Sequence, residues 1–232
     1  MGQVISASAS ADDIFADIET TYVRATARGG VWQTLATQRL GNVREVIGNV
    51  QSRLSTAQAE AAPLAATVAA QDQHADRLIG QVADTIWNAI DRPAFDPTYD
   101  VVFPGGIAHY TDGTNEGQPD RMALLGDLLE MNMITKLDPT LLASLVQQVR
   151  SETDAYRKVV EAAAKPMARV QQLQRARTAV AHAARMELGH LKRLYKAEGF
   201  SEADIHTVIP DRPRATKKPE ATPTASADKT QN

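Results

Sequence analysis

Apolar residues recur at alternating spacings of three and four along two long stretches of this chain, and this spacing constrains the fold more than any other feature. In the first stretch, thirteen of fifteen such seam positions are apolar: Leu40, Val43, Ile47, Val50, Leu54, Ala57, Ala61, Leu64, Val68, Ala75, Leu78, Val82 and Ala89, with Gln71 and Thr85 as the exceptions. An apolar content of 43% would place only about six there by chance. The pattern predicts one helix, over residues 31 to about 90, that packs along its length against another helix.

The second stretch predicts an equally long partner helix, over residues 139 to about 198. Its seam reads Leu142, Leu145, Val149, Glu152, Tyr156, Val159, Ala163, Pro166, Val170, Leu173, Arg177, Val180, Ala184, Glu187, Leu191 and Leu194. Three of these positions are charged rather than apolar. Asp138 and Pro139 have the residue types that favour an N-cap and a first helical position.

Each long helix contains one interior proline. Pro63 lies 27 residues before Ile90, and Pro166 lies 27 residues after Pro139. In an antiparallel hairpin the two prolines are therefore level, and we expect them to kink both helices at the same height. The alternative is that each proline breaks its helix into two shorter ones. In this register the numbers of opposite residues sum to about 229, which places Glu152 opposite Arg77 as a pair that would lock the register.

A Pro/Gly-rich stretch, residues 91–138, separates the long helices and predicts a small irregular head. Within it we expect a short β-hairpin, residues 100–103 and 107–111, turned by Pro104-Gly105-Gly106, and a short helix from Pro119 to about residue 135. A short helix over residues 11–28, capped by Ser10, should precede the first long helix, and another should follow the second and end near residue 209. We expect residues 1–10 and 210–232 to be disordered.

The predicted fold class is therefore all-α. The chain should form a long antiparallel helical hairpin that resembles a coiled coil, with proline kinks, a small head between the long helices, and short helices at the opposite end. Its segments are residues 11–90, 91–138 and 139–209. At 1.5 Å per residue each long helix spans roughly 90 Å. An aromatic content of only 5% suits narrow helix-on-helix seams.

The net charge of −3 conceals two oppositely charged regions. The head is acidic, since its residues 91–130 contain eight acids (Asp91, Asp96, Asp100, Asp112, Glu116, Asp120, Asp127 and Glu130) but only Arg92 and Arg121 as bases. The other end carries a basic patch, here called the base patch: Arg175, Arg177, Arg185, Lys192, Arg193 and Lys196. Solvated helix faces and helix-dipole complementation account for such charges, and the alternatives are self-association, an acidic protein partner or a phosphate-bearing surface.

The sequence contains no motif that carries a catalytic chemistry. Without cysteine it has no disulfide, thiolate metal site or cysteine nucleophile. Nucleotide-binding loops, nucleophile elbows and zinc-protease motifs are absent too. Residues 112–120 begin like a calcium loop, but Ala123 stands at position twelve, where a bidentate Glu is required. We therefore expect no enzymatic activity, no cofactor and no metal, and we interpret His74, His182 and His190 as ordinary surface histidines.

The head supplies the candidate binding surface: Phe103, Ile107, His109, Tyr110, Asp112 and Glu116. We expect a non-enzymatic structural or adaptor protein that associates with itself or links protein partners through the acidic head and the basic patch. A membrane-active, pore-forming-like helical protein is the alternative, and a metal-dependent site at His109, Asp112 and Glu116 is a third. The sequence disfavours nucleic acid as a partner, because aromatic residues do not interleave with the basic ones. It disfavours membrane on similar grounds, and with no signal or spanning segment we expect a cytoplasmic protein, with signal-less export as the alternative.

Overall fold

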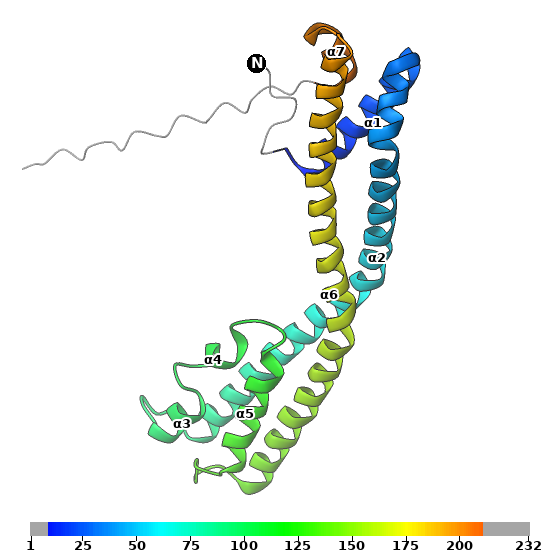
Figure 1. The fold of residues 1–232 in the computed structure, drawn as a ribbon. Helices are drawn as coiled ribbons and strands as arrows, with labels where there is room; N and C mark the ends of the chain where they lie inside the picture. Colours follow the sequence, from blue (N-terminus) through cyan, green and yellow to red (C-terminus); the bar gives the residue numbers. More distant parts are fainter. Residues whose placement is uncertain (1–8, 211–232) are drawn as a thin grey trace, which may run out of the picture. The chain divides into compact units, whose positions relative to one another are not determined.

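The computed structural model describes residues 9–210, which are mostly helical and contain no strand (Figure 1). The helices are α1 (Ala11–Arg28), α2 (Gly30–Ala89), α3 (Pro97–Val102), α4 (Ala108–Thr111), α5 (Gln118–Glu130), α6 (Pro139–Ala197) and α7 (Glu202–Val208). The predicted all-α class and both long helices are confirmed. The disorder predicted for the two ends falls on residues outside the described range, apart from residues 9, 10 and 210.

The chain divides into two compact units, and both long helices contribute to each. The first, here called the base unit, comprises residues up to 49 together with residues from 176 onward. The second, here called the head unit, comprises residues 50–175. In each unit a part of α2 packs antiparallel to a part of α6. The two units are described separately below.

In the base unit, α1 and α7 pack together and cover one end of the helix pair. Ser10 begins α1 with a capping box, in which its hydroxyl accepts a hydrogen bond from the Asp13 amide at 3.1 Å. Ser201 caps α7 by accepting from the Asp204 amide at the same distance. The phenol of Tyr195 on α6 donates to the Trp32 carbonyl on α2 at 2.9 Å, and the Trp32 ring stacks on Phe200. Both predicted short helices are therefore confirmed.

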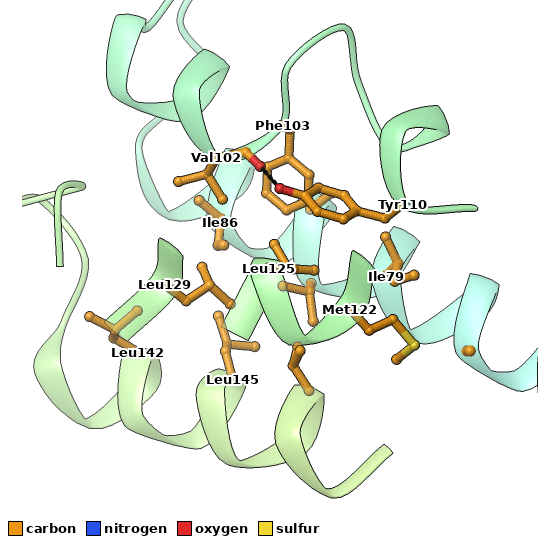
Figure 2. Close-up of a cluster of buried hydrophobic side chains, with 14 of the residues drawn as sticks. Ile79, Ile86, Val102, Phe103, Tyr110, Met122, Leu125, Leu129, Leu142 and Leu145 are labelled. Atoms are coloured by element: carbon orange, nitrogen blue, oxygen red, sulfur yellow. Dashed lines mark hydrogen bonds between the residues drawn. The ribbon is translucent and has the colours of Figure 1, made fainter. Parts of the chain in front are cut away.

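In the head unit, α3, α4 and α5 pack on the helix pair and enclose its largest apolar core (Figure 2). The core draws on every helix of the unit and includes Ile79, Ile86, Val102, Phe103, Tyr110, Met122, Leu125, Leu129, Leu142 and Leu145. Asp138 begins α6 as predicted, because its carboxylate accepts from the amides of Thr140 and Leu141. The helix predicted from Pro119 ends at Glu130, shortly before Asn132 takes a left-handed φ of 50°.

The predicted β-hairpin in the head is wrong, because both of its strands are helical. Asp96 caps α3 by accepting from the amides of Thr98 and Tyr99, each at 3.0 Å, and Pro97 occupies its first turn. The Asp96 cap and the first-turn proline stabilise a helix at this position. Their effect is larger than the preference of Val101, Val102 and Phe103 for a β-strand. The turn itself is confirmed, since Gly105 and Gly106 have φ values of 74° and 90°.

Both long helices run through their interior prolines without a break. Glu60 pairs with Arg169 at 3.3 Å, and these residues lie three positions before Pro63 and three positions after Pro166. Their numbers sum to 229, so the two prolines lie opposite each other in the antiparallel register. The alternative of broken, shorter helices is therefore wrong, and the predicted register is confirmed.

The heptad seam holds through the middle of each long helix but shifts by one position near the ends. Ile79 and Ile86 of α2 and Ile90, which directly follows the helix, are fully buried, whereas Thr85 is half-buried and Ala89 is exposed. In α6, Leu188 and Tyr195 are fully buried in place of Glu187 and Leu194. A straight helix has 3.6 residues per turn rather than 3.5, and the short helices at these ends bury a wider stripe than a two-helix seam does.

Candidate functional site

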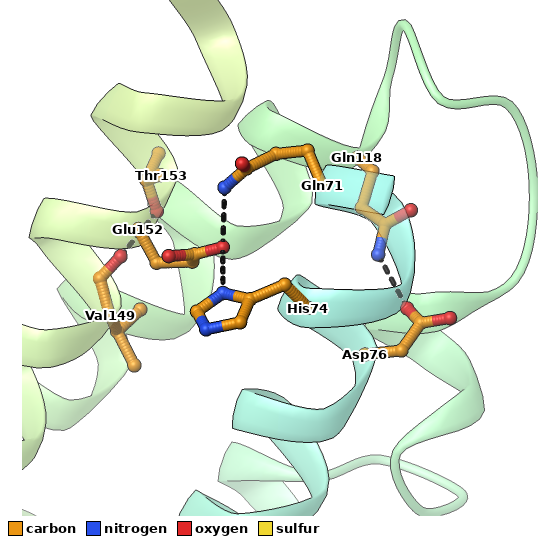
Figure 3. Close-up of polar contacts among 7 residues, drawn as sticks. All are labelled: Gln71, His74, Asp76, Gln118, Val149, Glu152 and Thr153. Atoms are coloured by element: carbon orange, nitrogen blue, oxygen red, sulfur yellow. Dashed lines mark hydrogen bonds and ion pairs between the residues drawn. The ribbon is translucent and has the colours of Figure 1, made fainter. Parts of the chain in front are cut away.

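A layer of polar side chains crosses the core of the head unit between α2, α5 and α6 (Figure 3). On one side of this layer the central residue is Glu152 of α6, whose side chain is only 11% exposed. One carboxylate oxygen, Oε1, is 2.6 Å from both Gln71 Nε2 and His74 Nδ1. The carboxylate thus receives two partners from α2 and ties the long helices together at a polar position of both seams.

The prediction that Glu152 pairs with Arg77 is wrong. The carboxylate reaches His74, one turn before Arg77 on α2, and Gln71 one turn further back. A side chain in an antiparallel seam has neighbours on both sides of the position opposite it. The register therefore predicts which residues of α2 lie near the Glu152 carboxylate, but it does not predict which of them the carboxylate contacts.

The other side of the layer contains two further hydrogen bonds across helices. The Tyr156 phenol on α6 donates to Asp72 on α2 at 2.8 Å, and the Gln118 amide on α5 donates to Asp76 on α2 at 2.7 Å. Burial, followed by the hydrogen bond to Asp72, raises the pKa of Tyr156 well above its usual value. The phenol therefore stays protonated at neutral pH and acts as a hydrogen-bond donor to Asp72.

Ionisation of Asp76 lowers the stability of the folded head unit. Replacement of Asp76 by asparagine is therefore expected to stabilise this unit. Burial, and then the charges of Asp72 and Asp112, raise the pKa of Asp76 above its usual value. A raised folded-state pKa means that stability falls as the pH rises through it. An asparagine side chain would keep an oxygen that accepts from Gln118, so Asp76→Asn should raise Tm by about one to three degrees at pH 7 and by nothing at pH 3.

Thermal unfolding of Asp76→Asn at both pH values, followed by the fluorescence of Trp87 in the head unit, checks this prediction. Asp84→Asn on the same helix is the matched control, because Asp84 is exposed. An equal gain at both pH values, or a loss at pH 7, would contradict it.

A polar groove of about 470 Å³ runs beside Glu152 and His74. The α6 wall of the groove is formed by Ser144, Gln147, Gln148 and Ser151, which recur at a helical spacing and so share one face of α6. The uncharged hydroxyl and amide groups of this wall can exchange hydrogen bonds with a ligand or partner.

Two of the six residues of the predicted head surface lie in the core instead. Phe103 is 1% exposed and Tyr110 is fully buried. The Tyr110 phenol donates to the Val102 carbonyl at 2.5 Å, and burial raises its pKa to about 12. Sequence reasoning placed both residues on a β-hairpin, where alternate side chains face solvent, whereas the short helices α3 and α4 turn them inward.

The other four residues of the predicted surface, Ile107, His109, Asp112 and Glu116, are exposed. They do not converge on a common point, and among the described residues no group of three or more histidine and acidic side chains is placed to hold a metal ion. The His109 ring instead stands edge-on to the ring of its neighbour Tyr110. Within the described part of the chain, His109, Asp112 and Glu116 are therefore not brought together as a metal site.

The loop with the calcium-like spacing surrounds an arginine side chain. Arg121 on α5 directs its guanidinium at the carbonyls of Tyr110 and Thr114, with each N···O distance 3.4 Å. A Cβ atom on Gly113 or Gly117 would lie only 3.2 or 3.1 Å from the guanidinium, and Gly113 also has a φ of 117°. The two glycines therefore allow the Arg121 side chain to approach the loop closely.

Part of the head acidity is neutralised inside the head unit by arginines of α6. Arg150 pairs with Asp127 at 2.5 Å and with Glu130 at 2.9 Å, and Arg157 pairs with Asp120 at 3.2 Å. Asp96 serves as the cap of α3. The remaining acids of the head, Asp91, Asp100, Asp112 and Glu116, are exposed.

The predicted base patch is likewise partly neutralised, here by acids of the short helices. Lys192 is 8% exposed, and Glu202 on α7 pairs with it at 2.5 Å and with Lys196 at 2.6 Å. These two lysines lower the pKa of Glu202 to about 2. Arg177 pairs with Asp12 on α1. Only Arg175, Arg185 and Arg193 of the six have no ion pair among the described residues, so the patch is weaker than its composition suggested.

All three charged seam residues of α6 find a partner on another helix. Besides Glu152 and Arg177, Glu187 pairs with Arg39 of α2 at 2.8 Å, and His190 Nδ1 lies 2.9 Å from the same guanidinium. Sequence reasoning treated His74 and His190 as surface histidines and missed both contacts. The available signal was the charged seam position itself, because a buried charge requires a partner nearby.

Comparison with protein-family models, with characterised proteins and with solved structures finds no match for this chain. In the part of the chain that the structure describes, each helix is too short or too polar to cross a membrane. Function is therefore argued below from the geometry and charge of the described residues.

Proposed function

We propose that this chain is a non-enzymatic helical scaffold that associates with itself or joins protein partners through its head. The single observation that carries the proposal is the exposed composition of residues 91–116. The exposed side chains of this segment include the acids Asp91, Asp100, Asp112 and Glu116 and the apolar residues Phe95, Val101 and Ile107, which are 70%, 52% and 41% exposed. The segment also contains the exposed Arg92, but its exposed charges are mainly acidic. Exposed apolar side chains among such charges are typical of a protein contact surface.

The internal ion pairs support the same proposal. In the head unit, arginines of α6 neutralise the acids of α5, whereas the exposed acids of residues 91–116 have no such partner among the described residues. Their charge is therefore directed at solvent and would favour a basic surface in a partner. Arg185 and Arg193 provide exposed or half-exposed positive charge in the base unit, so a second copy of the chain is one candidate partner.

Size-exclusion chromatography with light scattering, at low and at high sodium chloride, tests the self-associating form of this proposal. We expect a discrete oligomer at low salt that dissociates at high salt, since exposed charges are screened by salt. The double variant Asp100→Lys/Asp112→Lys should lower the measured mass at low salt. Glu45→Lys is the matched control, because Glu45 is an exposed acid of the base unit. The mass of a single chain at every salt concentration would overturn self-association.

A further inference from the structure

The head unit contains a second, mostly apolar cavity that the polar layer does not use. It has a volume of about 250 Å³. One wall is a stripe of α6 whose residues recur at i, i+3, i+4 and i+7, namely Val160, Ala163, Ala164 and Met167. Val68 of α2 adds a further apolar contact. Pockets for drug-sized ligands measure roughly 300–1,000 Å³, so this cavity suits a group the size of one long side chain.

The remaining wall of the cavity is polar and comes from the loop between α4 and α5. It consists of Thr114, Asn115 and Glu116, which supply a hydroxyl, an amide and a carboxylate. The Glu116 side chain is exposed and has no ion pair among the described residues. The cavity therefore combines an apolar floor with an anionic group at its rim.

The charges near this loop favour a cation. The charges of Asp72 and Asp112 lie close enough to Asp76 to raise the pKa of its carboxyl group, and Arg121 is the base that opposes them. The guanidinium of Arg121 donates to backbone carbonyls, including that of Thr114, so it is held within the loop. Arg157 of α6 is paired with Asp120 and lies 3.7 Å from Asp154.

We infer that the cavity receives a lysine or arginine side chain of a protein partner. The aliphatic stem would lie along the α6 stripe, and the cationic end would reach Glu116 with Thr114 and Asn115 as further hydrogen-bonding groups. Long cationic side chains bury their stems in this way while their charge stays at the surface, and a methionine such as Met167 adapts its shape to the stem. The inference rests on the proposed role of the head as a contact surface and names the chemistry of its partner.

Methyl NMR of the full chain labelled at the methionine methyl groups tests the inference with Nα-acetyl-lysine amide as the probe. Met167 lines the cavity, whereas Met131 and Met186 are exposed elsewhere, on the head unit and the base unit. We expect a saturable shift of the Met167 signal only. The norleucine analogue, which lacks the amine, should bind more weakly by about threefold, as an exposed ion pair contributes little.

Three variants separate the carboxylate from the cavity. Glu116→Gln should weaken binding of the lysine probe by about threefold and leave the norleucine analogue unaffected. Ala164→Leu should abolish the Met167 response by filling the cavity, and because Ala164 is exposed on a helix the chain should still fold. Asp100→Asn, which changes an exposed acid of α3 that does not line the cavity, should have no effect.

Equal binding of the two probes would overturn the cationic assignment, and a Met167 shift no larger than those of Met131 and Met186 would overturn the site. Because the probe is a small molecule, this result does not depend on self-association. A chain that stays monomeric but shows the Met167 response would contradict self-association alone. A salt-dependent oligomer without the response would contradict only the cavity.

Discussion

Replacement of Phe103 by alanine is expected to destabilise the head unit by about 3–5 kcal/mol. The ring is 1% exposed and meets Tyr110 edge to face at a centroid distance of 5.8 Å and Tyr99 at 5.0 Å. Its loss would leave a cavity at the junction of α3, α4 and α5, where the surrounding helices are too short to close the gap. Urea unfolding followed by the fluorescence of Trp87, whose ring packs against Tyr99, measures the change.

Phe95→Ala is the matched control for this variant. It deletes the same side chain just before α3 begins, but Phe95 is 70% exposed, so the free energy of unfolding should change by less than about 0.5 kcal/mol. If Phe103 were instead a surface contact, as its sequence neighbourhood suggested, the two variants would be equally stable. That outcome would refute the helical arrangement of residues 97–111.

Replacement of Tyr195 by alanine should destabilise the base unit by a similar amount, about 3–5 kcal/mol. The side chain is fully buried, its ring centroid lies 4.4 Å from that of Trp32, and its phenol donates to the Trp32 carbonyl. The variant therefore loses both the apolar contact of a large ring and a donor for a carbonyl of α2. Trp32 is the tryptophan of this unit and reports its unfolding separately from Trp87.

Two further variants divide this effect into its parts. Tyr195→Phe keeps the ring and removes only the hydrogen bond, so it should cost about 1 kcal/mol. Leu194→Ala tests the heptad seam, which assigned Leu194 to the helix interface, and the half-buried position predicts a smaller loss than that of Tyr195→Ala. A larger loss at Leu194 would mean that the seam continues unshifted to the end of α6.

The two tryptophans matter for both measurements because the chain consists of two compact units. A protein with more than one unit need not unfold in a single transition. We expect Phe103→Ala to shift the transition reported by Trp87 and Tyr195→Ala to shift the one reported by Trp32. In each variant, the transition reported by the other tryptophan should change less, relative to the parent chain, than the transition of the altered unit.

Local features of the sequence determined the helices and their register. Ser10, Asp138 and Ser201 cap helices through hydrogen bonds to amides two or three residues away, an interaction that needs no distant partner. The seam spacing determined that α2 and α6 pair along their length. The equal distances of Pro63 and Pro166 from the head determined the antiparallel register, which the Glu60–Arg169 pair confirms.

Only the tertiary structure decided which side chains are available for function. Phe103 and Tyr110 are buried because α5 packs against α3 and α4, and no local pattern in residues 97–111 encodes that contact. Lys192 and Arg177 of the base patch are paired with acids of other helices, Glu202 on α7 and Asp12 on α1. Glu152 contacts His74 and Gln71 rather than Arg77. Capping and seam spacing act within one or two turns, whereas burial and charge pairing depend on residues that only the folded chain brings together.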